Sequence, residues 1–229
     1  MTYYGFEISQ DIQKLSQRSD EINMRTDYTK TAQTIRDLKD TIRANKSLNI
    51  TSLSASQIER FDRVFCINFN GDVRAFINPV ITKTEGFKFV REKSPSIPDR
   101  EFIVPRSEVI YAVYQRGDGR PESNKFEGLA AEIFQQQVDM LDGVLISDFG
   151  LEILPEFESA TDEEKQELLK EYMKFLKRKY KKLNKEIEND PDLKKISDGA
   201  KFINAVAKGE VQLEKLNNEQ KTESEEPKN

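Results

Sequence analysis

The 229-residue sequence contains no histidine and no tryptophan, and it has a single cysteine, Cys66. The absence of histidine removes the commonest general base and the commonest zinc ligand of proteins. One cysteine cannot form an internal disulfide, and Cys66 lies in the apolar run Val-Phe-Cys-Ile. We therefore interpret Cys66 as a small buried hydrophobe rather than a reactive thiol.

Long apolar runs are also missing, and none approaches the length that spans a bilayer. The first five residues, Met-Thr-Tyr-Tyr-Gly, lack the basic-then-apolar pattern of a signal peptide, so we expect a cytoplasmic protein without membrane contact. The net charge of −5 and the pI near 5.2 argue against non-specific binding to nucleic acid by the molecule as a whole. Because 34% of the residues are charged, part of the chain is expected to be solvated helix or tail.

The N-terminal two thirds of the sequence show helix and strand patterns in an α+β order. Apolar residues recur at three- and four-residue steps from Thr29 to Ala44, which predicts an amphipathic helix. A hairpin is predicted from Arg63 to Ile77 around the turn Asn-Gly-Asp, and a further strand from Glu108 to Arg116. A second helix is expected to open at about Phe126 and to end at Asp142-Gly143. We expect small antiparallel or mixed sheets with helices before and after them.

Beyond Pro155 the composition shifts to glutamate and lysine, which is typical of a charged helix. Thr161 and Glu164 form a T-x-x-E capping box at its start. An apolar stripe follows at helical spacing, and we predict that it contacts another protein chain. The stripe consists of Leu168, Tyr172, Leu176, Tyr180, Leu183 and Ile187.

These shifts in composition predict three regions of the chain. Residues 1–155 are expected to form the α+β domain, and residues 156–216 a charged helical extension. The polar segment 217–229 is expected to be a disordered tail.

Three short motifs stand in order within the first region. The third, residues 127–145, resembles the metal-binding helix of peptide deformylases, and Gln136, Gln137 and Met140 stand where that helix has His, Glu and His. The second, Glu-Lys-Ser-Pro-Ser-Ile-Pro, resembles the motif with the metal-ligating cysteine, and Ser94 replaces that cysteine.

The first motif, Ser-Leu-Ser-Ala-Ser-Gln, resembles the family's Gly-Leu-Ala-Ala-x-Gln and retains Gln57. The segments Ile77–Ile81 and Val104–Glu108 also fall where the family has Asn-Pro and Val-x-Arg. From Phe6 to Asp148 the chain therefore resembles the peptide deformylase family, as a degenerate member, and the resemblance implies that family's fold.

The resemblance also implies a metal site of two histidines and one cysteine, with a fourth position for water. Ser94, Gln136 and Met140 are poor substitutes, because a hydroxyl, a carboxamide and a thioether are weak ligands for such an ion. Gln137 cannot move a proton as a carboxylate does, and Pro95 has no N–H where the resemblance implies a donor to the formyl oxygen. We therefore expect no metal, no other cofactor, no catalytic residue and no small-molecule substrate.

We interpret the retained Gln57 as a satisfied polar residue of the remnant pocket. The expected function is that of a catalytically inactive pseudoenzyme, a structural or assembly protein that binds other chains. Because bacterial viruses carry deformylase-like genes, this interpretation includes a phage virion or the host cytoplasm as the location. Two alternatives stay open: a ribosome- or RNA-associated pseudoenzyme that uses the basic segment Lys174–Lys185, and an active hydrolase with a re-invented site.

Overall fold

The computed structural model describes residues 5–45, 47 and 50–189 of the chain. It divides into two compact units. The first extends to Ala160, and the described part of the second is helix α6, Asp162–Asn189. The other helices, all in the first unit, are α1 (Ile12–Leu15), α2 (Tyr28–Ala44), the 3-10 helix η2 (Ala55–Ile58), α3 (Gly128–Leu141), α4 (Ile146–Phe149) and α5 (Pro155–Ser159).

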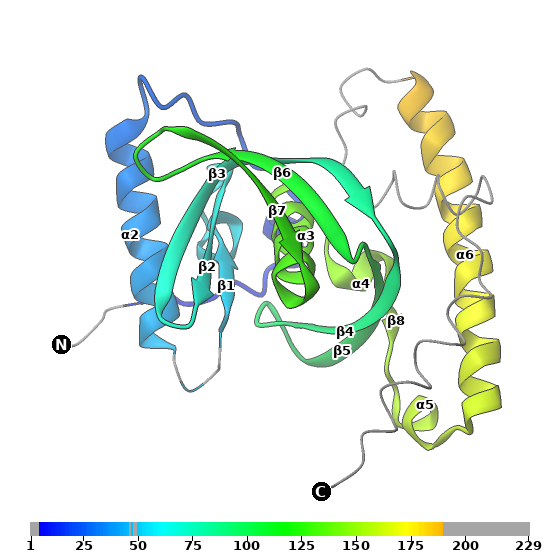
Figure 1. Cartoon of the computed structure of the whole chain (residues 1–229). Helices are drawn as coiled ribbons and strands as arrows, with labels where there is room; N and C mark the ends of the chain where they lie inside the picture. The colour runs from blue at the N-terminus through cyan, green and yellow to red at the C-terminus, as the bar shows by residue number, and fades with distance from the viewer. Residues whose placement is uncertain (1–4, 46, 48–49, 190–229) are drawn as a thin grey trace, which may run out of the picture. The chain divides into compact units, whose positions relative to one another are not determined.

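The strands of the first unit form two antiparallel sheets (Figure 1). The larger sheet has the order β1-β2-β3-β6-β7, and the smaller has the order β4-β5-β8. The strands are β1 (Ser52–Ser54), β2 (Val64–Phe69), β3 (Asp72–Glu85), β4 (Lys88–Ser94), β5 (Ile97–Arg106), β6 (Val109–Gln115), β7 (Pro121–Glu127) and β8 (Leu151–Glu152).

The larger sheet is covered by a helix on each face, and β2 shows how its sequence allows this. Successive strand residues point to opposite faces, so Val64 and Cys66 pack in one cluster with Leu38 of α2. Phe65 alternates with them and packs in the other cluster with Phe134 of α3, at a ring-centroid distance of 5.0 Å. The continuous apolar run of residues 64–67 in β2 therefore lies between α2 and α3 in the core.

Several elements predicted from the sequence are confirmed. The helix predicted from Thr29 to Ala44 is α2, and the predicted hairpin is formed by β2 and β3. The strand predicted from Glu108 to Arg116 is β6. The interpretation of Cys66 as a buried residue is also correct, and burial raises the pKa of its thiol to about 12.

The start predicted for the second helix, near Phe126, is wrong. Residues 121–127 form β7, which pairs with β6 along its whole length and places Phe126 opposite Ile110. The backbone of this segment is hydrogen-bonded to the neighbouring strand β6. The polar side chains of the segment give no indication of this pairing. Helix α3 begins at Gly128.

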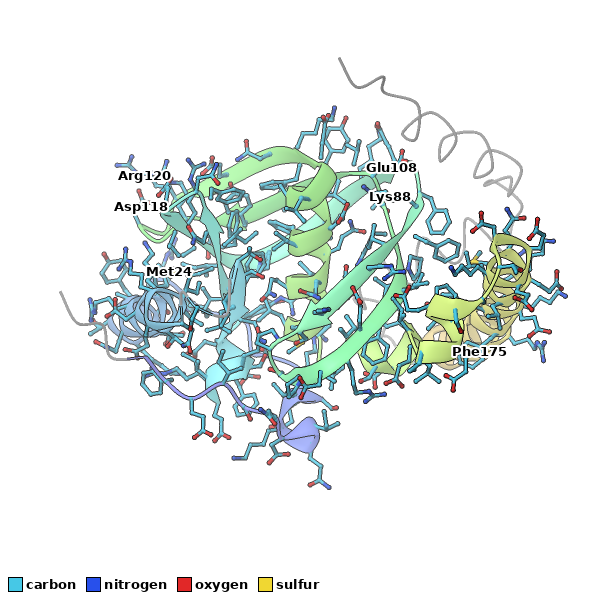
Figure 2. The ribbon with its side chains drawn as sticks, turned by 90° about the horizontal axis from the view of Figure 1, so that it is seen from below. Met24, Lys88, Glu108, Asp118, Arg120 and Phe175 are labelled. Carbon is cyan, nitrogen blue, oxygen red and sulfur yellow. The ribbon has the colours of Figure 1, made fainter. Side chains whose placement is uncertain are left out.

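Two glycines mark places where the chain passes close to another segment. Gly86, between β3 and β4, has φ +66°, and a Cβ there would lie 2.2 Å from the Glu108 carboxylate, which Figure 2 labels. Gly143, just after α3, has φ +73°, and a Cβ there would lie 2.4 Å from the carbonyl oxygen of Ser16. The positive φ favours glycine at both positions, and at Gly143 the backbone carbonyl of Ser16 also leaves no room for a Cβ.

Helix α6 confirms the predicted charged helix. Its capping box is present, because Thr161 N donates to Glu164 Oε2 (2.8 Å) and Glu164 N donates to Thr161 Oγ1 (3.3 Å). Of the apolar stripe, Tyr172 and Leu176 are buried and Leu168 is 39% exposed.

The remaining stripe side chains, Tyr180, Leu183 and Ile187, lie outside the described residues, as does the segment from residue 190 that includes the predicted tail. Contact of the stripe with a partner stays a prediction. None of the helices that the structure describes is long and apolar enough to cross a membrane.

Candidate functional site

Side-chain hydrogen bonds join the three motifs of the sequence to one another. Gln57, at the end of the first motif, donates from Nε2 to Ser96 Oγ of the second at 3.1 Å. Gln136 of the third motif donates to the carbonyl oxygen of Lys93 in the second at 3.1 Å. Gln137 donates to Ser52 Oγ of the first at 3.0 Å. The residues predicted to share a site are therefore brought together.

The second motif forms the turn between β4 and β5. Ser94 pairs with Ile97 across this turn, and the Ser96 N–H donates to Ser94 Oγ at 3.3 Å. Both serines are buried. Pro95 stands between them and contributes a carbonyl but no N–H.

Gln57 is held on both ends of its carboxamide. It is 1% exposed, and its Oε1 accepts from the backbone N–H of Ser54 at 3.0 Å. Its Nε2 makes the bond to Ser96 described above. The interpretation of Gln57 as a satisfied polar residue agrees with these contacts.

The third motif lies on α3. Residues four positions apart share a face of an α-helix, so Gln136 and Met140 lie on one face of α3. Gln136 is half-buried, and Met140 is 3% exposed. Gln137 is 2% exposed, and its Oε1 is buried without a hydrogen-bond partner among the described residues. An unfilled buried acceptor costs about 1–3 kcal/mol, so the position of this oxygen is unfavourable in the structure as described.

Beside this face lies a buried ion cluster that sequence reasoning missed. The Arg106 guanidinium donates to both carboxylate oxygens of Glu92, at 2.6 and 2.8 Å, and to Asp139 Oδ2 at 2.5 Å. Gln136 Nε2 also donates to Glu92 Oε2 at 3.0 Å. Burial, with Glu92 nearby, raises the pKa of Asp139 to about 6 despite the guanidinium. The available signal was the match of Glu92 and Arg106 to the family's motifs.

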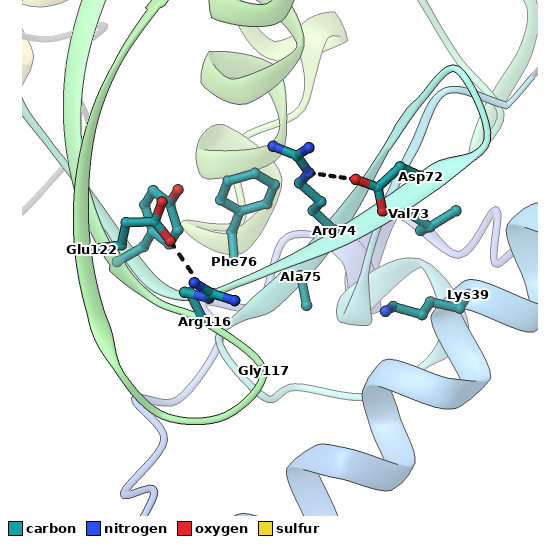
Figure 3. Close-up of a pocket in the computed structure, with 10 residues that line it drawn as sticks. Lys39, Asp72, Val73, Arg74, Ala75, Phe76, Arg116, Gly117 and Glu122 are labelled. Carbon is teal, nitrogen blue, oxygen red and sulfur yellow. Dashed lines mark hydrogen bonds and ion pairs between the residues drawn. The ribbon is translucent and has the colours of Figure 1, made fainter.

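A separate hollow of about 440 Å³ is lined by residues 72–76 of β3 together with Lys39, Tyr114, Arg116, Gly117 and Glu122, and none of the predicted site residues lines it (Figure 3). Arg74 Nε lies 2.7 Å from Asp72 Oδ2, and Arg116 Nε lies 3.7 Å from Glu122 Oε2. Lys39 of α2 points toward the same hollow (Figure 3). The arginines of the hollow are exposed and are paired with carboxylates, so they do not form a buried binding site. The three joined motifs therefore remain the candidate functional site.

Comparison with known proteins decides the family. The sequence profile of the polypeptide deformylase family matches residues 7–150. The chain belongs to the peptide deformylase family. A peptide deformylase of Dictyoglomus turgidum is 34% identical over 128 residues, which cover 56% of this chain and 80% of the relative. Peptide deformylase 2 of Xanthomonas axonopodis pv. citri is 30% identical over 100 residues, 42% of this chain and 59% of the relative.

Solved structures of peptide deformylases share the fold. That of the Thermotoga maritima protein has a TM-score of 0.57 at 27% identity and covers 64% of this chain and 97% of its own. A Synechococcus elongatus peptide deformylase in complex with actinonin has a TM-score of 0.56 at 26% identity, covering 64% and 77%. A probable peptide deformylase from Synechococcus phage S-SSM7 has a TM-score of 0.56 at 25% identity, covering 63% and 99%. The predicted fold is confirmed.

The prediction of a catalytically inactive structural protein is contradicted by these comparisons. The relatives carry the name of an enzyme, peptide deformylase, and none of the names supports a structural, virion-assembly or RNA-associated pseudoenzyme role. The replaced motif residues are few, whereas the relationship to the family extends over residues 7–150.

The residues at the positions where the resemblance implies metal ligands do not fit a divalent ion. Ser94 Oγ accepts a hydrogen bond, and the amide nitrogen of Gln136 is turned to two acceptors. Met140 offers a buried thioether, which suits soft ions. Among the described residues no group of three histidine, cysteine, aspartate or glutamate side chains could hold a metal.

Proposed function

We propose that this protein acts in the cytoplasm on the amino terminus of polypeptides as a peptide deformylase, which removes an N-terminal formyl group. The observation that carries the proposal is the family match over residues 7–150, which contains all three joined motifs. The named relatives support the same activity.

The residues of the site contribute orientation and hydrogen bonding to this function. Hydrogen bonds to Ser54 and Ser96 fix the carboxamide of Gln57, which therefore links the first two motifs. Gln137 is fixed at its nitrogen by Ser52, which leaves its oxygen as an acceptor. Because this oxygen is buried, a peptide N–H reaches it only after the side chains over it move; the new hydrogen bond then removes the cost of the unfilled acceptor and positions the peptide.

The test is release of formate from formyl-Met-Ala-Ser, measured with the full chain as purified and after addition of iron, nickel or zinc. We expect release above a boiled-protein control. Gln137→Met keeps the length of the side chain but removes the acceptor, so kcat/KM should fall about tenfold, the size of one hydrogen bond.

The matched control is Arg74→Ala, which lies in the separate hollow and should leave kcat/KM unchanged. Absence of formate under every metal condition would refute the proposed function. Equal kcat/KM in the Gln137→Met variant and the native chain would show that Gln137 does not position the peptide.

A further inference from the structure

Helix α3 contacts the turn between β4 and β5. Neutral side chains stand there, at the positions where the family resemblance implies a metal ion. Gln136 spans the gap by itself, since its Nε2 donates both to the Lys93 carbonyl oxygen (3.1 Å) and to Glu92 Oε2 (3.0 Å). We propose that these hydrogen bonds, rather than a divalent transition-metal ion, join α3 to the turn in this protein.

The contacts of the three metal positions support this directly. Gln136 has its two amide hydrogens turned to acceptors, so only its neutral Oε1 is left for a cation. Ser94 Oγ already accepts the Ser96 N–H, and a hydroxyl holds its proton at neutral pH. Met140 presents a thioether, which is a poor ligand for Zn²⁺, Fe²⁺ or Ni²⁺.

The nearby carboxylates are also committed to other partners. Both oxygens of Glu92 accept from Arg106, and Asp139 accepts from the same guanidinium. A cation placed beside them would compete with a buried arginine that already supplies the positive charge. Three of the four carboxylate oxygens of Glu92 and Asp139 are therefore already occupied by hydrogen bonds from Arg106.

The amide of Gln137 adds a second neutral bond of the same kind. Its Nε2 donates to Ser52 Oγ at 3.0 Å and joins α3 to β1. Together with the bond from Gln57 to Ser96, each pair of motif segments is joined by at least one side-chain hydrogen bond.

The proposed hydrogen bonds hold the segments together whether or not the protein has the proposed activity. Formate release by metal-free protein would support both proposals. No formate and no metal would refute only the activity.

The first experiment uses the native full chain. After incubation with zinc, iron or nickel salts and desalting, elemental analysis should find far less than one ion per chain, and a chelator should leave the melting temperature unchanged. Gln136→Met removes both hydrogen bonds and should lower the melting temperature by about 2–8 °C. Retention of about one ion per chain, or a chelator-sensitive melt, would overturn the inference, as would an unchanged melt of the Gln136→Met variant.

The second experiment restores metal ligands at the same positions. The triple variant Ser94→Cys, Gln136→His, Met140→His should retain about one zinc ion per chain, and its melting temperature should fall when zinc is chelated. Met140→His alone is the matched control and should retain none.

A folded triple variant that binds no zinc would show that the backbone geometry, and not the side-chain chemistry, excludes the ion. That result would count against the inference. If the triple variant does not fold, as judged by circular dichroism, the measurements on the native chain decide the question.

Discussion

Two regions of the protein pair arginine with carboxylates, and they differ in their exposure to water. In the first, Arg106 lies between Glu92 and Asp139, and all three side chains are buried. In the second, Arg74 and Asp72 pair in the hollow of Figure 3, with 65% and 63% of their side-chain surfaces exposed. The donor and acceptor chemistry is the same in both.

The difference shows how burial changes the role of an ion pair. An exposed pair is screened by water and contributes about 0–1 kcal/mol to stability. In a buried cluster each charge depends on its partners, because removal of one leaves the others desolvated and unpaired. The Arg106 cluster therefore holds β4, β5 and α3 together beside the candidate site, whereas the pair of Arg74 and Asp72 leaves the fold little affected.

The largest expected effect comes from removal of the central cation. Arg106→Met leaves the carboxylates of Glu92 and Asp139 buried without a counter-charge, so the free energy of unfolding should fall by about 3–5 kcal/mol at neutral pH. Urea denaturation followed by circular dichroism measures this. A loss below about 1 kcal/mol would place this cluster in the same class as the exposed pairs.

A smaller, pH-dependent effect is expected at Asp139. Its pKa is raised to about 6 in the folded protein, from an ordinary value of 3.8, so folding favours its protonated form. Stability from this group is complete below about pH 4 and is lost as the pH rises to about 6, with a total change of about 2–3 kcal/mol.

Asp139→Asn cannot ionise and should remove this part of the pH dependence. The measurement is the free energy of unfolding of both proteins from pH 4 to pH 7. Parallel pH profiles of the two would show that the carboxyl of Asp139 titrates at its ordinary pKa.

The smallest effect is expected in the hollow. Arg74→Ala removes an exposed guanidinium from Asp72 and should change the free energy of unfolding by less than about 1 kcal/mol. The same urea titration measures it, and the difference should shrink further in high salt. If Arg74→Ala lowered the free energy of unfolding as much as Arg106→Met does, exposure to water would not explain the difference between the two regions.

The predicted elements that proved correct depend on local patterns. The helix α2 shows its apolar period within one segment, and the hairpin of β2 and β3 is marked by its own turn, Asn70-Gly71-Asp72. The strand β7 was missed because its stability comes from pairing with β6 and not from its own composition. Boundaries that depend on a neighbouring strand are not visible in one segment.

For the candidate site, the order of the three motifs predicted which segments meet. That Ser94, Gln136 and Met140 stand at the metal positions stays a prediction from the resemblance, while the functional conclusion drawn from them was wrong. A few substituted positions describe the local chemistry, whereas the activity named for the family follows from the relationship over residues 7–150.

The sequence by itself determined the α+β class, the helices α2 and α6, the hairpin and the meeting of the three motifs, because periodicity and motif order are properties of the chain alone. Only the tertiary structure decided that Arg106 joins Glu92, 14 residues away, to Asp139, 33 residues away. It also decided that Gln137 Oε1 is buried with no hydrogen-bond partner in the part of the chain that the structure describes. Burial and hydrogen-bond partners are set by packing between distant segments, and no single segment contains that information.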